Sequence, residues 1–180
     1  MIQKYFIGYK GGGDIEKYYQ AITKDLHEKF GIRNLSLRVP SHCTLKYPFE
    51  LDDTSDIENR INEFLADRFP IEFLIEGFGT FDDNHKTIFL SPTHTDALDA
   101  FVEDFIISLG DLNEKEKFNP KGFRLHISVA RHLTEETFLE VWNYLNTLSR
   151  PHFVLSFDNI TLFILEDNVW RVKKTFLLKR

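Results

Sequence analysis

Four tripeptides of the form His-x-Ser/Thr occur in this 180-residue chain, and two of them lie in segments that read as extended strands. These two are His42-Cys43-Thr44 and His126-Ile127-Ser128. Side chains alternate across a strand, so the imidazole and the hydroxyl of each tripeptide share one face. The other two, in a polar turn and before a helix, are His85-Lys86-Thr87 and His132-Leu133-Thr134. We interpret that second pair as incidental.

A cation lies in phase with each strand histidine, and apolar residues occupy the opposite face. Lys46 follows His42 and Thr44 on one strand, and Arg124 precedes His126 and Ser128 on the other. A polar face is costly to bury without partners, whereas the apolar face suits a core. If two such strands pack about a pseudo-two-fold axis, their polar faces meet across a cleft.

Two imidazoles, two hydroxyls and a cation suit the cleavage of a phosphodiester. One imidazole takes a proton from the attacking oxygen and the other protonates the leaving oxygen, and histidine titrates near the pH where both tasks are possible. Hydroxyls donate hydrogen bonds to the non-bridging oxygens, and Lys46 or Arg124 would offset their charge. This chemistry requires neither a metal nor a cofactor.

The hydrophobic pattern predicts the elements that would position these residues. For the first half it predicts a strand over 2–9, a helix capped by Asp14 and ending near 30, an alternating segment over 35–39, a strand centred in 41–49, a helix from 53 or 54 to 68, and a hairpin of 71–78 with 87–90. For the second half it predicts a helix over 96–109, a strand over 123–130, a helix capped by Thr134 and ending near 148, and a long hairpin of 153–165 with 169–178.

Both halves therefore run helix, strand, helix, hairpin, which indicates a diverged internal duplication. His42 and His126 hold equivalent places, and Pro70 and Pro151 both precede the first strand of a closing hairpin. We predict an α+β fold of two pseudo-symmetric lobes, with antiparallel sheets lining a central cleft and helices outside. The lobes would cover approximately 1–92 and 93–180 of a single domain, with strand exchange between them left open.

Composition limits the classes of partner and compartment. The chain has 22 basic and 28 acidic residues and a formal charge of −6, which argues against coating of long duplex nucleic acid but allows a local pocket for one phosphate. No apolar run approaches the roughly 18 residues of a membrane span. A single cysteine, Cys43, excludes an internal disulfide and is read as a small buried hydrophobe. We expect a cytoplasmic protein without a membrane partner.

The chain resembles the two-histidine (2H) phosphoesterase superfamily, and within it the 2′,5′ RNA ligase or RNA 2′,3′-cyclic phosphodiesterase group. The resemblance rests on the segments 40–45 (PSHCTL) and 125–131 (LHISVAR) and on their placement in two similar halves. It implies metal-free hydrolysis of 2′,3′-cyclic phosphates or 2′,5′ linkages at nucleotide or RNA ends. His42 and His126 would be acid and base, and Thr44 and Ser128 would bind phosphate. Ser41 and Cys43 depart from the family pattern, which weakens any assignment to a subgroup.

Several alternatives stay open from the sequence. The cleft could bind nucleotide or RNA ends without turnover, and a metal-dependent hydrolase is a less favoured third reading. Lys46 and Arg124 could be solvated strand charges, and Arg131 and His132 would reach the site only if the strand bends. Core packing explains the aromatic residues near the motifs better than base stacking does; these are Tyr47, Phe49, Phe123 and Trp170. The physiological substrate, the acid and base assignment, the ester bond cleaved and the oligomeric state are not fixed.

Overall fold

The computed structural model describes residues 1–81, 86–110 and 124–179, and it has the predicted α+β class with antiparallel sheets. The strands are β1 (Gln3–Lys10), β2 (His42–Leu51), β3 (Ile71–Phe81), β4 (Thr87–Pro92), β5 (Ile127–Ala130), β6 (His152–Phe157), β7 (Asn159–Glu166) and β8 (Val169–Leu177). The helices are α1 (Gly13–Phe30), α2 (Ser55–Leu65), α3 (Asp96–Ser108) and α4 (Glu135–Leu145), with a short 3-10 helix, η1, at Leu35–Leu37.

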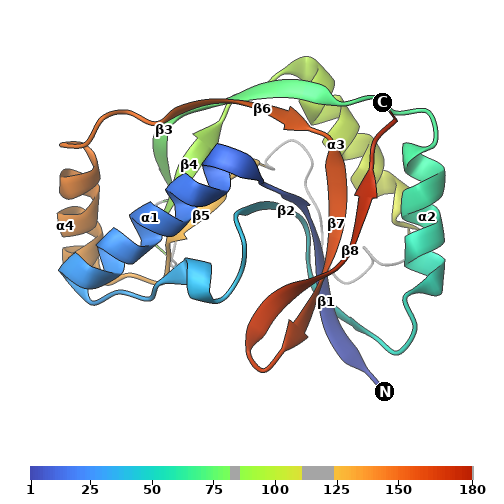
Figure 1. Ribbon diagram of the computed structural model, residues 1–180, viewed down its shortest axis with the longest axis horizontal. Helices are drawn as coiled ribbons and strands as arrows, with labels where there is room; N and C mark the ends of the chain where they lie inside the picture. The colour runs from blue at the N-terminus through green and yellow to red at the C-terminus, as the bar shows by residue number, and fades with distance from the viewer. Residues whose placement is uncertain (82–85, 111–123, 180) are drawn as a thin grey trace.

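Two four-stranded antiparallel sheets form the frame of the molecule. Sheet A has the order β2-β1-β7-β8, and sheet B has the order β5-β4-β3-β6. Each sheet therefore combines two strands from residues 1–92 with two from residues 93–180. Figure 1 shows α1 and α4 together at one end of the molecule and α2 and α3 together at the other.

Threonine caps both helices in the second half of the chain, and the cap at Thr134 was predicted. The Thr95 side chain accepts a hydrogen bond from the Leu98 amide at the start of α3, and Thr134 accepts one from the Thr137 amide at the start of α4. In α1 the prediction of Asp14 as N-cap is wrong. Gly12 occupies that position without a side-chain bond, and Asp14 lies in the first helical turn, where a carboxylate favours the helix dipole.

The long strand predicted over 153–165 is wrong, because the chain leaves sheet B at Asp158 and enters sheet A. β6 pairs with β3, whereas β7 pairs with β1 and β8. The Asn159 side chain makes this crossing possible, since it accepts a hydrogen bond from the Lys10 amide at 3.1 Å and donates one to the Lys10 carbonyl at 3.0 Å. Hydrophobic alternation on both sides of the crossing conceals it in the sequence.

Two further segments differ from their predicted form. The alternating segment at 35–39 contains η1, because the Asn34 side chain accepts hydrogen bonds from the Ser36 amide and hydroxyl and closes a turn. The strand predicted over 123–130 is shorter: β5 begins at Ile127, residue 123 lies outside the described residues, and the pairing with β4 covers Ile127 to Ala130. His126 therefore lies immediately before β5.

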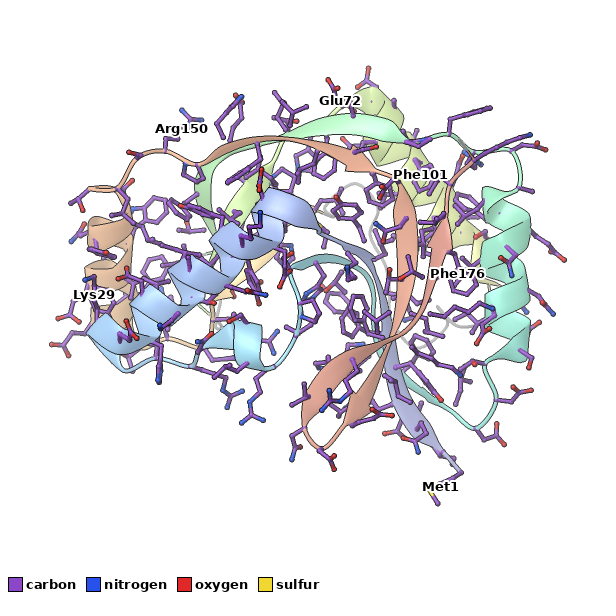
Figure 2. All side chains as sticks on the ribbon, in the orientation of Figure 1. Met1, Lys29, Glu72, Phe101, Arg150 and Phe176 are labelled. Carbon is purple, nitrogen blue, oxygen red and sulfur yellow. The ribbon has the colours of Figure 1, made fainter. Side chains whose placement is uncertain are left out.

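A single large cluster of buried side chains forms the core between the sheets and the helices. Figure 2 shows Phe101 of α3 and Phe176 of β8 pointing inward, whereas Lys29, Glu72 and Arg150 lie on the outside. Three buried phenylalanines, Phe6, Phe89 and Phe163, are not part of this core cluster. Among the described helices, none is long and apolar enough to cross a membrane.

Candidate active site

His42 is the first residue of β2 and is half-buried at the edge of sheet A. Its Nδ1 lies 2.8 Å from the carbonyl oxygen of Pro40. The centroid of its ring lies 4.9 Å from that of Phe6 on β1 and 5.8 Å from that of Phe163 on β7. Phe6 and Phe163 stack on each other, so His42 stands against an aromatic wall built by the two central strands of the sheet.

His126 has a matching environment in sheet B. Its Nδ1 lies 2.8 Å from the carbonyl oxygen of Arg124, again the residue two positions earlier. Its ring centroid is 4.9 Å from that of Phe81 on β3 and 5.5 Å from that of Phe89 on β4. The same hydrogen bond and the same pair of flanking phenylalanines thus recur around both histidines, although the sequence around them is not repeated.

The hydrogen bonds at Nδ1 determine which tautomer each neutral ring adopts. A carbonyl oxygen only accepts, so the proton of the neutral imidazole resides on Nδ1 and the lone pair on Nε2. In the neutral form of both rings, Nε2 is therefore the nitrogen that carries the lone pair. The restraint by a backbone carbonyl also limits rotation of each ring, which prepares it for one fixed proton-transfer geometry.

A hydrogen bond at the Cys43 sulfur connects the two histidine motifs. The backbone of His126 hydrogen-bonds the Cys43 sulfur, which lies fully buried next to His42 in β2. Burial raises the pKa of the Cys43 thiol to about 12, as expected of a structural cysteine. This placement agrees with the sequence interpretation of Cys43 as a small buried hydrophobe. Cys43 is also one of the two residues that depart from the family pattern, and it lies where the two motifs are in contact.

The surroundings of His42 favour its neutral form. Its pKa is lowered to about 4, chiefly by burial and in smaller part by the charges of His126 and Arg131. The hydrogen bond to Pro40 and the charge of Glu16 act in the opposite direction. His126 and Arg131, both from the second half of the chain, are thus among the charges that act on His42.

The two predicted phosphate-binding hydroxyls lie in phase with the histidines. Thr44 and Ser128 are both half-buried, whereas their strand neighbours Cys43, Leu45 and Val129 are buried on the opposite face. Thr44 pairs with Gly8 of β1, and Ser128 pairs with Phe89 of β4. Their roles in binding phosphate stay a prediction.

The cations are placed less uniformly than the sequence suggested. Lys46 is 6% exposed, so its ammonium is not a solvated strand charge, while the Arg124 side chain is exposed. Arg131 acts on His42 from the other half of the chain. β5 ends at Ala130, and His132, the residue after Arg131, has a left-handed backbone with φ of 59°, so the alternation of β5 does not extend to Arg131.

The aromatic residues near the motifs divide between core and site. Phe49 packs against the core, and Tyr47 is half exposed. Trp170 of β8 meets the Phe6 ring edge-on at 4.8 Å and so belongs to the aromatic wall beside His42. Phe123 lies outside the described residues.

Gly8 permits the close approach of β1 to the first motif. A Cβ atom at Gly8 would lie 2.6 Å from the carbonyl oxygen of Cys43, a backbone atom that cannot move without shifting β2. We expect Gly8→Ala to lower the free energy of unfolding by about 1–3 kcal/mol, as overpacking does. Urea denaturation checks this. Gly12→Ala is the matched control, because its Cβ would meet no atom within 4 Å; equal effects of the two substitutions would contradict the prediction.

Potential metal ligands do not gather near either motif in the described part of the chain, where no group of three or more His, Cys, Asp or Glu side chains could hold an ion. The site is instead composed of imidazole, hydroxyl, cationic and aromatic groups.

Comparisons with known proteins identify the family to which the chain is similar. A model of the 2′-5′ RNA ligase superfamily matches residues 15–168. A Geobacillus kaustophilus protein named "Putative phosphoesterase GK0864" is 28% identical over 143 residues, which are 78% of this chain and 79% of that protein. A Bacillus licheniformis protein, also named a "Putative phosphoesterase", is 25% identical over 142 residues, 78% of this chain and 81% of its own length.

Solved structures show a similar fold over almost the whole chain. Escherichia coli LigT in its apo form superposes with a TM-score of 0.58 at 14% identity and covers 99% of both chains. TT0787 of Thermus thermophilus gives a TM-score of 0.57 at 16% identity and covers 97% of both chains. LigT complexed with 3′-AMP gives a TM-score of 0.59 at 12% identity over 99% of both chains.

Proposed function

Because this chain belongs to the 2′-5′ RNA ligase superfamily, also called the two-histidine phosphoesterases, we propose that it is a metal-independent phosphodiesterase. Its substrates would be 2′,3′-cyclic phosphates or 2′,5′ linkages at nucleotide or RNA ends. The observation that carries this proposal is the matched pair of histidines. Each is held at Nδ1 by a backbone carbonyl, which leaves the lone pair on Nε2, and the charge of His126 contributes to the lowered pKa of His42.

The proposed reaction is hydrolysis of a phosphodiester by in-line displacement. A water oxygen attacks phosphorus while the Nε2 lone pair of one histidine accepts a proton from that water. The bond from phosphorus to the leaving ribose oxygen breaks, and this oxygen takes the proton carried by Nε2 of the other, protonated histidine. The product is a phosphomonoester, and the two histidines finish with their protonation states exchanged.

The remaining site residues would stabilise charge on the phosphate. Thr44 and Ser128, in phase with the histidines, would donate hydroxyl hydrogen bonds to the non-bridging oxygens. Lys46, Arg124 and Arg131 would offset the negative charge, with Arg131 supported by its effect on His42. A nucleotide substrate is supported by the solved complexes of LigT with 3′-AMP, ATP and NADP+, although these concern a relative of low sequence identity.

Incubation of the purified protein with nucleoside 2′,3′-cyclic phosphates in the presence of a chelator tests the proposal. We expect a nucleoside monophosphate to appear, detected by phosphorus NMR or chromatography, at a rate that the chelator does not change. Binding of the cyclic phosphate without product would instead identify a binding module. Loss of turnover on chelation, restored by added metal, would identify a metal-dependent hydrolase and overturn the proposed mechanism.

A further inference from the structure

Ser41, the residue before His42, is fully buried and its polar groups are held from two sides. Its amide N–H and its hydroxyl both donate to Oε2 of Glu16, at 2.7 and 2.5 Å. Its carbonyl accepts a hydrogen bond from the Gly11 amide at 2.9 Å. Glu16 lies in the first turn of α1, so these hydrogen bonds connect the start of this helix to the residue immediately before the first motif.

The Ser41 amide and the Pro40 carbonyl belong to the same peptide unit, which is planar and polarisable. At one end of this unit, the Pro40 oxygen accepts the Nδ1 proton of His42 at 2.8 Å. At the other end, the Ser41 N–H donates to the Glu16 carboxylate. A continuous path of hydrogen bonds thus runs from the carboxylate through one peptide to the imidazole.

We propose that Glu16 is a positioning residue for His42 and acts on it through the Pro40–Ser41 peptide. Hydrogen bonds in a chain polarise one another, so a carboxylate at the N–H end makes the carbonyl at the other end a stronger acceptor. A stronger acceptor holds the proton on Nδ1, orients the ring and supports the charged form that arises during proton transfer. Carboxylates that contact a histidine directly have this effect on metal-ligating and catalytic imidazoles.

Other titratable and charged groups near His42 also affect its pKa. His126 approaches from sheet B, and Arg131 follows β5; both lower the pKa of His42, whereas Glu16 raises it. Lys10 is the register partner of His42 on β1. Tyr19 of α1 is buried near Glu16 and Arg131, and burial raises the pKa of its phenol. The carboxylate of Glu16 is the anionic group of this set.

The proposal is tested by comparing the wild type with Glu16→Gln in ligand-free protein. Proton–nitrogen NMR of the histidine side chains gives both the shift of the Nδ1 proton and the pKa of each ring. Glutamine has the shape of glutamate, and its amide oxygen still accepts from the Ser41 amide and hydroxyl, so the substitution removes charge and keeps the anchor. We expect the His42 Nδ1 proton to move upfield and the His42 pKa to fall, with little change at His126. Asp14→Asn is the matched control, since it removes an exposed carboxylate from the same helical turn.

A second variant separates polarisation from anchoring and covers the case in which Glu16→Gln does not fold. Ser41→Ala removes the hydroxyl that shares Oε2 with the amide, so the carboxylate interacts more strongly with the peptide N–H. We expect the His42 pKa to rise, opposite in sign to the effect of Glu16→Gln. A purely structural anchor would lower the melting temperature in both variants and leave the Nδ1 signal and pKa of His42 unmoved, which would overturn the proposal.

The importance of this path for catalysis rests on the proposed phosphodiesterase function, but its test does not. The NMR measurements need neither substrate nor turnover. A normal Glu16 effect in an inactive protein would refute the function alone, and turnover without a Glu16 effect on His42 would refute the path alone.

Discussion

Replacing either His42 or His126 by glutamine is expected to lower kcat/KM for a nucleoside 2′,3′-cyclic phosphate by about 10²- to 10⁴-fold. A well-placed general acid or base contributes a rate factor of this order. Glutamine cannot transfer a proton at neutral pH, although its amide can hydrogen-bond the carbonyl that holds Nδ1 in the wild type. Initial rates measured with a chelator present give the comparison directly.

Two controls show whether this loss is chemical. His27→Gln is the matched substitution, because His27 is exposed and its Nδ1 also bonds a backbone carbonyl, that of Ile32 at 2.7 Å. It should leave turnover unchanged. Thr44→Val removes a hydroxyl donor that stabilises charge but keeps both histidines. It should therefore lower kcat/KM less than the loss of a histidine does. Retention of more than a tenth of wild-type activity by a folded His42→Gln or His126→Gln protein would refute the two-histidine mechanism.

The protein is expected to lose stability between about pH 6.5 and pH 4 because of His42. Burial lowers the pKa of this imidazole to about 4 in the folded chain, below its value of about 6.5 in an unfolded chain. In that interval the unfolded state binds more protons, so the free energy of unfolding falls as the pH falls and recovers above pH 6.5. The full difference corresponds to about 3 kcal/mol.

Urea denaturation at several pH values measures this contribution as the difference between wild type and His42→Gln. The variant lacks the titrating group, so its curve should be flatter between pH 4 and pH 6.5 than that of the wild type. Parallel curves for wild type and His42→Gln would show that the imidazole is as well solvated in the folded protein as in the unfolded chain.

Local signals predicted most of the helices and strands. The missed turn at η1 and the missed cap of α1 are local features, whereas long-range pairing accounts for the largest error. The helix expected at 96–109 is α3, Asp96–Ser108, because Thr95 caps it and its apolar residues follow helical spacing. The break at Asp158 was missed, since the residues on both sides alternate and only the pairing of β6 with β3 and β7 with β1 separates them. Sequence period reports which face is buried but not which sheet buries it.

For the candidate site, alternation predicted the burial pattern within the strands and gave no direction beyond their ends. Thr44 and Ser128 lie in phase with their histidines as the two-residue period requires. Arg131 lies beyond the end of β5, so the period says nothing about its direction. Glu16 is distant in sequence from Ser41, and only the packing of α1 beside β2 brings them together. In the sequence, Ser41 stood out only as a departure from the family pattern before the first motif, and its burial is visible only in the structure.

Both sheets combine strands from the first and the second half of the chain, so the candidate active site can form only late in synthesis. β1 and β2 emerge from the ribosome long before β7, which pairs with β1 and contributes Phe163 beside His42. Until then the edge of β1 that faces away from β2 has no partner strand, and such an edge can pair with other polypeptides. Sheet A around the first motif can therefore be completed only after residues beyond 160 have been synthesised. This late pairing favours binding of the nascent chain by chaperones over independent folding of its first half.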